Sequence, residues 1–179
     1  MIEYKYEQMF YDGGIMALNK RWIKVFLACQ SELGYQIKVK RNLIHTLVGF
    51  NHNAMHIEDC ECLFERIRKL IKAEKLLIKL QEDLRRAIAS LDETKKKILH
   101  LRHKEYLDYQ DIALRSGLKI RSVFYQYNKA VERILSKFIE RGYTDKDLIE
   151  GLEGDPLIID GFCKNELRER RTSSVRCCT

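Results

Sequence analysis

Proline is nearly absent from this sequence, which contains one in 179 residues. Proline interrupts helices because its ring clashes with the preceding turn and it lacks a backbone N–H. Its scarcity, together with 45% hydrophobic and 33% charged residues, favours helices packed around a hydrophobic core. We therefore expect an all-α fold.

A long apolar segment is also missing. No apolar run reaches the roughly 18 residues that a membrane-spanning helix needs. Residues 1–14 are polar and mixed in charge, unlike a secretory signal. The expected location is therefore the cytoplasm, without a membrane partner.

The cysteines lack a regular spacing and are expected to be reduced thiols. The six are Cys29, Cys60, Cys62, Cys163, Cys177 and Cys178. Zinc prefers histidine and cysteine ligands, and His52, His56 and Cys60 are four residues apart, with Cys62 close by. Structural zinc sites usually show paired ligands, and no second pair occurs. We expect no metal, with these four residues as the candidates for one.

Motifs of catalysis are missing as well. The sequence has no glycine-rich phosphate loop, no nucleophile elbow and no convincing pair of acidic residues. The chain is therefore expected to be a binding protein without enzymatic activity or cofactor. Its 33 Lys+Arg against 26 Asp+Glu give a net charge of +7, which favours a polyanionic partner such as nucleic acid.

The N-terminal third mixes helical and strand-like patterns. Apolar residues at helical spacing predict a helix within 15–33 that ends near Gly34. Residues 35–40 alternate apolar and polar side chains like a short strand. Residues 42–50 read as another short helix, and 51–53 as a loop.

A heptad pattern follows. Leucine recurs every seven residues, with isoleucine at the complementary position: Leu63, Leu70, Leu77, Leu84 and Leu91, with Ile67 and Ile88. Glu74 and Gln81 interrupt the complementary position. The pattern predicts one long helix whose apolar seam is buried against another helix. Two partners remain open: the helix containing Trp22, in an intramolecular hairpin, or a second copy, in a homodimer through residues 63–91.

Two aspartates mark the starts of further helices. Asp92 is placed to cap a helix at 93–106, and Asp108 one at 109–116, while Gly117 permits a tight turn. The expected inward-facing residues are Ile98, Leu101, Ile112, Ala113, Val123, Tyr127, Ala130 and Ile134. A short helix, a glycine turn and a second helix form a helix-turn-helix pattern.

These elements predict three parts. Residues 1–90 form a helical module containing the long heptad helix, which is a candidate coiled coil. Residues 91–141 form the helix-turn-helix domain. Residues 142–179 comprise a short helix capped by Thr144 and Asp145, followed by a basic tail.

Residues 91–135 resemble the fourth conserved region of bacterial sigma factors, and more closely the small phage and prophage transcription regulators of the ArpU and RinA type. The matching residues are Leu91, Ile98, Leu99, Leu101, Arg102, Tyr106, Leu107, Tyr109, Ile112, Ala113, Gly117, Leu118, Ser122, Val123 and Ala130. The resemblance implies a transcription regulator that binds double-stranded DNA at promoters. It departs from the family pattern at Lys119, where Ser or Thr often caps the helix, and at Phe124 and Tyr125, where basic residues are common. No counterpart of the second sigma region occurs.

Helix-turn-helix docking places the start of the second helix in the major groove. The candidate DNA-binding residues on this helix are Lys119, Arg121, Ser122, Phe124, Tyr125, Asn128 and Lys129, and those at the start of the preceding helix are Tyr109 and Gln110. Arg121 is expected to contact guanine, and Ser122 a base edge or a phosphate. Tyr109 and Gln110 are expected to meet phosphates. For Phe124, contact with a thymine methyl and packing within the protein both remain open.

Two other functions fit the same pattern. A stand-alone sigma-like factor would bind core RNA polymerase through the N-terminal helices. A DNA-recognition subunit of a viral genome-packaging machine would also pair a helix-turn-helix with a coiled coil.

Overall fold

The computed structural model describes residues 18–49 and 57–152, together with Asp155 and Gly161. Throughout these residues the only regular elements are helices, which confirms the predicted all-α class for this part of the chain. In chain order they are α2 (Lys20–Ala28), α3 (Leu33–Gly49), α4 (Ile57–Ala89), α5 (Glu93–His103), α6 (Tyr109–Ser116), α7 (Ile120–Glu140) and α8 (Asp145–Leu152). None of these helices has both the length and the hydrophobicity to cross a membrane.

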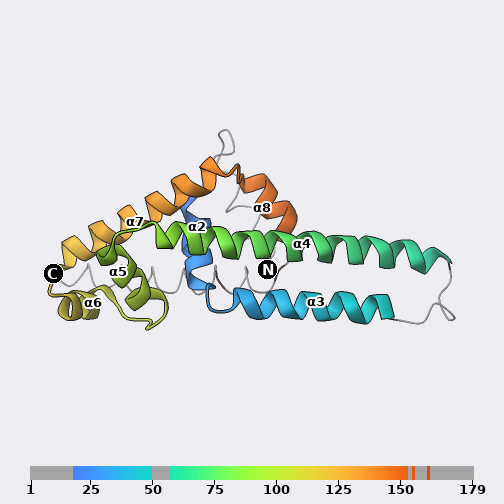
Figure 1. The fold of residues 1–179 in the computed structure, drawn as a ribbon, viewed down its shortest axis with the longest axis horizontal. Coiled ribbons are helices and arrows are strands. Elements are labelled where there is room, and N and C mark those ends of the chain that lie inside the picture. Colours follow the sequence, from blue (N-terminus) through green and yellow to red (C-terminus); the bar gives the residue numbers. More distant parts are fainter. Residues whose placement is uncertain (1–17, 50–56, 153–154, 156–160, 162–179) are drawn as a thin grey trace, which may run out of the picture.

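Helices α3 and α4 lie antiparallel and form an arm that extends away from the other helices (Figure 1). Gly34 of α3 lies beside the side chain of Gln81, and Arg41 donates from Nε to Oε1 of Glu74 at 2.9 Å. With 33 residues, α4 is about 50 Å long at 1.5 Å per residue. The prediction of one long helix is therefore confirmed. The helix that packs along α4 in the arm is α3. The helix that contains Trp22, α2, was the partner expected for an intramolecular hairpin, and it packs on α7 and α5 instead.

Two predictions for the N-terminal third are wrong. Residues 35–40 lie within helix α3 and form no strand. Leu33 and Ile37, one helical turn apart, are both buried, while Tyr35 and Val39 are exposed. The alternating pattern therefore coincided with a helix whose one face is covered. The first helix also ends earlier than expected, at Ala28, and Gly34 belongs to the first turn of α3.

Helix α7 is the centre of the hydrophobic core and contacts α2, α4, α5 and α6. Near its end, Phe138 is fully buried between Phe26 and Tyr143, with ring-centroid distances of 6.1 and 4.9 Å. Trp22 stacks on the other side of Phe26 at 5.7 Å. Aromatic residues bury large apolar areas, so this cluster fixes α2 against the end of α7.

A buried polar network joins α4 to the turn that follows α7. The hydroxyl of Tyr143 donates to Oδ2 of Asp83 at 2.8 Å. Nη1 of Arg141 lies 2.9 Å from Asp83 Oδ1 and also donates to the Asp83 carbonyl at 3.1 Å. Burial and the hydrogen bond to Asp83 hold the pKa of Tyr143 far above its ordinary value.

This network gives a pH-dependent stability. We expect the free energy of unfolding to fall as the pH rises above 10, the ordinary pKa of tyrosine. The folded chain holds the Tyr143 proton more tightly than the unfolded chain, so the stabilisation is complete below pH 10 and is lost above it. Urea unfolding of Tyr143→Phe on both sides of that pH should show a flatter decline. Tyr35→Phe, which changes an exposed tyrosine, is the control; equal slopes in all three proteins would contradict the expectation.

Candidate nucleic-acid interface

Local signals in the sequence set the starts of α5 and α6. Asp92 caps α5 by accepting from the Lys95 N–H at 3.3 Å. Asp108 caps α6 by accepting from the N–H groups of Gln110 and Asp111 at 2.9 and 2.8 Å. Both capping roles were predicted and are confirmed.

A glycine sets the turn between α6 and α7. Gly117 ends α6 with a φ of 67°, in the left-handed region that glycine adopts without strain. Lys119 follows as the N-cap of α7 and makes no capping bond with its side chain. The backbone therefore reverses at the predicted position, and the side chain of Lys119 is left exposed.

The inner faces of α6 and α7 pack against each other and against α5. Every residue predicted to face inward in this region is buried: Ile98, Leu101, Ile112, Ala113, Val123, Tyr127, Ala130 and Ile134. This packing fixes which side of α7 faces solvent.

An aromatic cluster holds the start of α6 on α7. The ring of Tyr109 meets those of Phe124 and Tyr127 edge-on, at centroid distances of 5.0 and 5.6 Å. The Tyr127 hydroxyl lies 3.2 Å from Nε2 of His103, and the two rings stack at 5.8 Å. Tyr127 thus has the packing role predicted for it. Phe124 and Tyr109 are half-buried, so their rings also contribute to packing.

Sequence reasoning missed the part of Arg102 in this cluster. Its guanidinium lies 4.4 Å from the centroid of the Tyr109 ring, and its Nη1 donates to the Leu107 carbonyl at 2.9 Å. Arg102 follows Ile98 by four residues, which places it on the buried face of α5. That spacing was the available signal, because an arginine stem packs on apolar surface while its head finds a polar partner.

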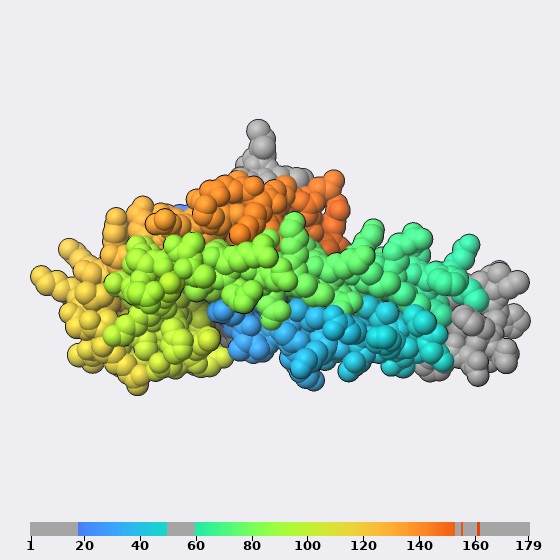
Figure 2. Space-filling model, in the orientation of Figure 1, coloured from blue at the N-terminus to red at the C-terminus, as the bar shows by residue number. Residues whose placement is uncertain are grey.

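The opposite side of α7 carries most of the candidate DNA-binding residues. Lys119, Arg121, Ser122, Tyr125 and Lys129 are exposed there, and Gln110 is exposed on α6. The remaining candidate on α7, Asn128, is half-buried. Figure 2 shows α6 and the start of α7 at the end of the molecule opposite the tip of the arm.

The charges on this side differ in how they are engaged. Lys119 and Arg121 form no ion pair with any residue that the structure describes. Lys129 lies 3.0 Å from Oε2 of Glu132, and this hydrogen bond raises the pKa of Lys129. Glu132 is also bound at 2.9 Å by Lys20 of α2, so two cations share one carboxylate. Among these cations, the two at the start of α7 are thus the more available to an anionic partner.

A surface groove of about 400 Å³ continues from Tyr125 along α7 toward the start of α5. Its lining residues are Lys95, Tyr125, Gln126, Lys129, Glu132, Arg133 and Ser136. Three of them are cations and one is an anion. Lys95 and Arg133 were not among the predicted site residues, although Arg133 follows Lys129 by one helical turn and shares its face.

The zinc candidates are only partly within the described residues. Cys60 and Cys62 lie in the first turns of α4 with free thiols, the former half-buried and the latter exposed. His52 and His56 lie outside the described residues. Among the residues that the structure does describe, no three His, Cys, Asp or Glu side chains gather as a metal site would require.

The assignment of a function therefore depends on the chemistry of the α6–α7 surface. Comparison with known proteins adds no relative: the chain matches no protein-family model, no curated protein and no solved structure.

Proposed function

We propose that this chain is a DNA-binding transcription regulator that acts at promoter DNA through a helix-turn-helix formed by α6 and α7. In this arrangement the start of α7 enters the major groove and α6 crosses the phosphate backbone. The observation that carries the proposal is the two-sided character of the first turns of α7. One side is buried against α5 and α6, and the other presents Lys119, Arg121, Ser122 and Tyr125 to solvent.

The exposed residues suit different parts of a DNA duplex. Arg121 can donate two parallel hydrogen bonds to guanine O6 and N7, and Ser122 can bond to a base edge or a phosphate. Lys119, at the rim of the turn, is suited to a phosphate. The edge-on contact between Phe124 and Tyr109 supports a packing role for Phe124 and leaves Arg121 as the main source of sequence preference.

The groove between α7 and α5 would extend the contact along the backbone. Lys95, Lys129 and Arg133 line it together, and cations that neutralise phosphates release condensed counterions. Tyr109 and Gln110, at the start of α6, would meet the backbone on the other side of the reading helix. Phosphate contacts on both sides would fix the orientation of α7, while Arg121 and Ser122 would read the sequence.

Selection of bound duplexes from a random pool, with purified full-length protein, tests the proposal directly. Enrichment of one defined sequence is the expected result. A pool that stays random while still binding would show that the surface holds only phosphates. No retention of DNA at moderate salt would refute DNA binding altogether.

We expect Arg121→Ala to relax the sequence specificity of DNA binding. Lys119→Ala is expected to weaken the affinity for DNA and to leave the sequence specificity unchanged. Loss of a bidentate contact to guanine costs about 1–3 kcal/mol, so Arg121→Ala should lower the ratio of specific to competitor binding by roughly 5- to 150-fold. Lys119→Ala should weaken both kinds of binding and reduce the slope of log affinity against log salt by about 1. Fluorescence anisotropy with selected and scrambled duplexes measures both quantities.

Lys38→Ala is the matched control, because Lys38 is an exposed lysine on the arm helix α3. Its binding should equal that of the wild type. If the two α7 variants also behave like the wild type, the start of α7 does not face DNA.

A further inference from the structure

A glutamate in the groove along α7 is bound by lysines from two helices. Oε1 of Glu132 lies 2.9 Å from Nζ of Lys20, which begins α2, and Oε2 lies 3.0 Å from Nζ of Lys129. The side chains of the two lysines are 54% and 49% exposed. The hydrogen bond from Lys20, together with that from Lys129, holds the pKa of Glu132 below its ordinary value. Two accessible cations therefore converge on one charged carboxylate.

Both lysines are positioned beside the surface that we propose for DNA. Nζ of Lys129 lies 5.8 Å from the centroid of the Tyr125 ring, and both residues line the groove. Lys20 is 112 positions away from Glu132 in the sequence, yet α2 packs on α7, where Phe26 stacks on Phe138. This packing fixes the start of α2 next to the groove.

The position of the Glu132 carboxylate is suited to a phosphate. Carboxylates and phosphates both present anionic oxygens, and a lysine binds either of them as a point charge. An exposed ion pair contributes little to stability, so the exchange of one anion for another at these lysines costs little. A backbone phosphate that displaced Glu132 would contact two cations, one of them from outside the helix-turn-helix.

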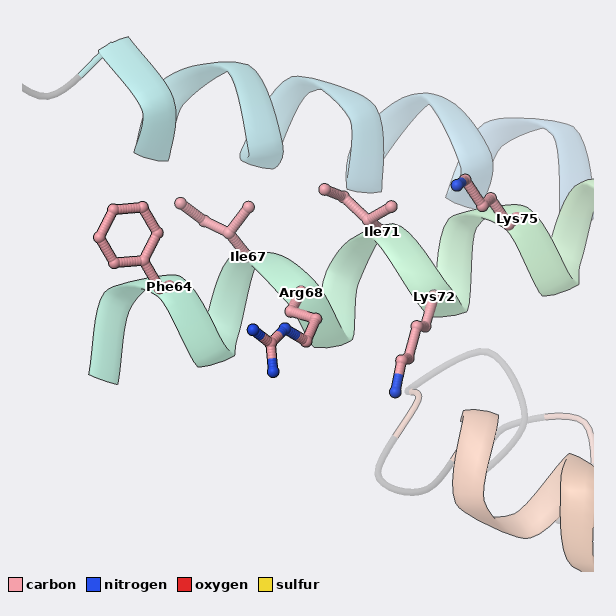
Figure 3. Close-up of a pocket in the computed structure, with 6 residues that line it drawn as sticks. All are labelled: Phe64, Ile67, Arg68, Ile71, Lys72 and Lys75. Atoms are coloured by element: carbon pink, nitrogen blue, oxygen red, sulfur yellow. The ribbon is translucent and has the colours of Figure 1, made fainter. Parts of the chain in front are cut away.

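The groove on the arm contains several cations without this convergence. Its lining residues on α4 are Phe64, Ile67, Arg68, Ile71, Lys72 and Lys75 (Figure 3). In Figure 3, Arg68 and Lys72 project away from α3, whereas Lys75 projects toward it. Within the part of the chain that the structure describes, no carboxylate is bound by two of these three cations. Lys72 is therefore a suitable control for the loss of one exposed lysine.

We propose that Lys20 and Lys129 form a binding site for one phosphate of the DNA backbone, and that the Glu132 carboxylate occupies this site when DNA is absent. This inference rests on the proposed DNA binding and adds to it a contact from α2. The phosphate must displace the carboxylate, so Glu132 lowers the affinity for DNA of any sequence. A phosphate contact of this kind carries no sequence information.

The two partners of the Lys20–Glu132 ion pair should therefore affect DNA binding in opposite directions. Lys20→Ala removes a phosphate ligand and should weaken the affinity for a scrambled duplex by roughly 2- to 10-fold. Glu132→Gln removes the competing charge but keeps the shape of the side chain, and should strengthen that affinity by a similar factor. The selected duplex should show the same two changes, because every sequence carries the backbone phosphate. Fluorescence anisotropy with the full-length protein measures them.

Two control variants make the same changes of charge elsewhere. Glu140→Gln removes a carboxylate that lies 2.8 Å from Lys137, at the same three-residue spacing on α7 but outside the groove. Lys72→Ala removes an exposed lysine from the arm. Each control should change the affinity less than the matching variant at the site.

Opposite shifts that exceed those of the controls support the site. Weaker binding by both variants would show that the ion pair only holds α2 on α7, and it would overturn the proposal. Shifts no larger than those of the controls would overturn it equally. A wild-type chain that retains no duplex would refute DNA binding itself, whereas a wild type that binds while both variants bind equally well would refute only this site.

Discussion

Asp83→Ala is expected to lower the free energy of unfolding by about 3–5 kcal/mol, the cost typical of removing one partner from a buried ion pair. Asp83 is 6% exposed and accepts the Tyr143 hydroxyl at 2.8 Å. It also holds the Arg141 guanidinium at 2.9 Å. Alanine would leave a buried hydroxyl without its acceptor and a partly buried cation without its counter-charge. Urea unfolding followed by circular dichroism measures the loss.

The neighbouring Glu82→Ala provides the matched control. Glu82 is on the same turn of α4, but it is exposed and, among the described residues, pairs only with Arg86 at 3.4 Å. Exposed pairs of this kind contribute about 0–1 kcal/mol, so this variant should unfold almost like the wild type. Equal effects of Asp83→Ala and Glu82→Ala would show that the buried network contributes nothing beyond an ordinary surface pair.

Phe138→Ala should destabilise the chain by a similar amount, about 3–5 kcal/mol, through loss of burial and the cavity left behind. Phe138 is 0% exposed and lies between the rings of Phe26 and Tyr143. Its loss would therefore loosen α2 and the turn after α7 together. The same denaturant titration measures the effect, and the near-ultraviolet signal of the single tryptophan, Trp22, reports on the packing around Phe26.

Ile139→Ala changes the adjacent residue, which is 48% exposed, and should cost far less than Phe138→Ala. Both substitutions shorten an apolar side chain in the same turn of α7. Their difference therefore isolates the contribution of the aromatic cluster. If the two variants had equal stability, the cluster would not be the main tie between α2 and α7.

The caps, the glycine turn and the inner faces between Asp92 and Ile134 could be predicted, because their signals are local, although α5 ends at His103 and not at residue 106 as expected. Aspartate side chains cap α5 and α6 through bonds to residues two or three positions away. Gly117 is needed for a φ of 67° wherever the chain packs. The inner face of α7 follows from helical spacing alone. Such features depend little on distant parts of the chain.

The N-terminal third could not be predicted as well, because tertiary contacts decide its structure. Residues 35–40 alternate like a strand, yet Leu33 and Ile37 are buried and α3 packs along α4, and these tertiary contacts select the helix. The heptad pattern indicated a buried seam without naming its partner, which is α3. The Asp83–Tyr143 bond joins residues 60 positions apart, and no local pattern marks such a pair.

The candidate site likewise contains features that the sequence could predict and features that depend on contacts between helices. The sequence was sufficient to predict that Tyr127 is buried, because its position on the apolar face of α7 is visible in the spacing. It was not sufficient to place Arg102 against the Tyr109 ring or Lys95 in the same groove as Arg133, since each pair brings together residues of different helices. The assembled surface is thus wider than the predicted residues alone.

Because α4 is one continuous helix, it fixes the rotation of the outer arm relative to the helices at its other end. This helix runs without a break from Ile57 to Ala89, and α5 begins four residues later at Glu93. Each residue inserted into α4 would turn the outer arm by about 100° and move it about 1.5 Å outward. Seven added residues would nearly restore the orientation at about 10 Å greater reach, whereas two would turn the outer arm to face the opposite side. Because α3 packs along the same helix, α3 would have to be lengthened to match for the two arm helices to stay in register.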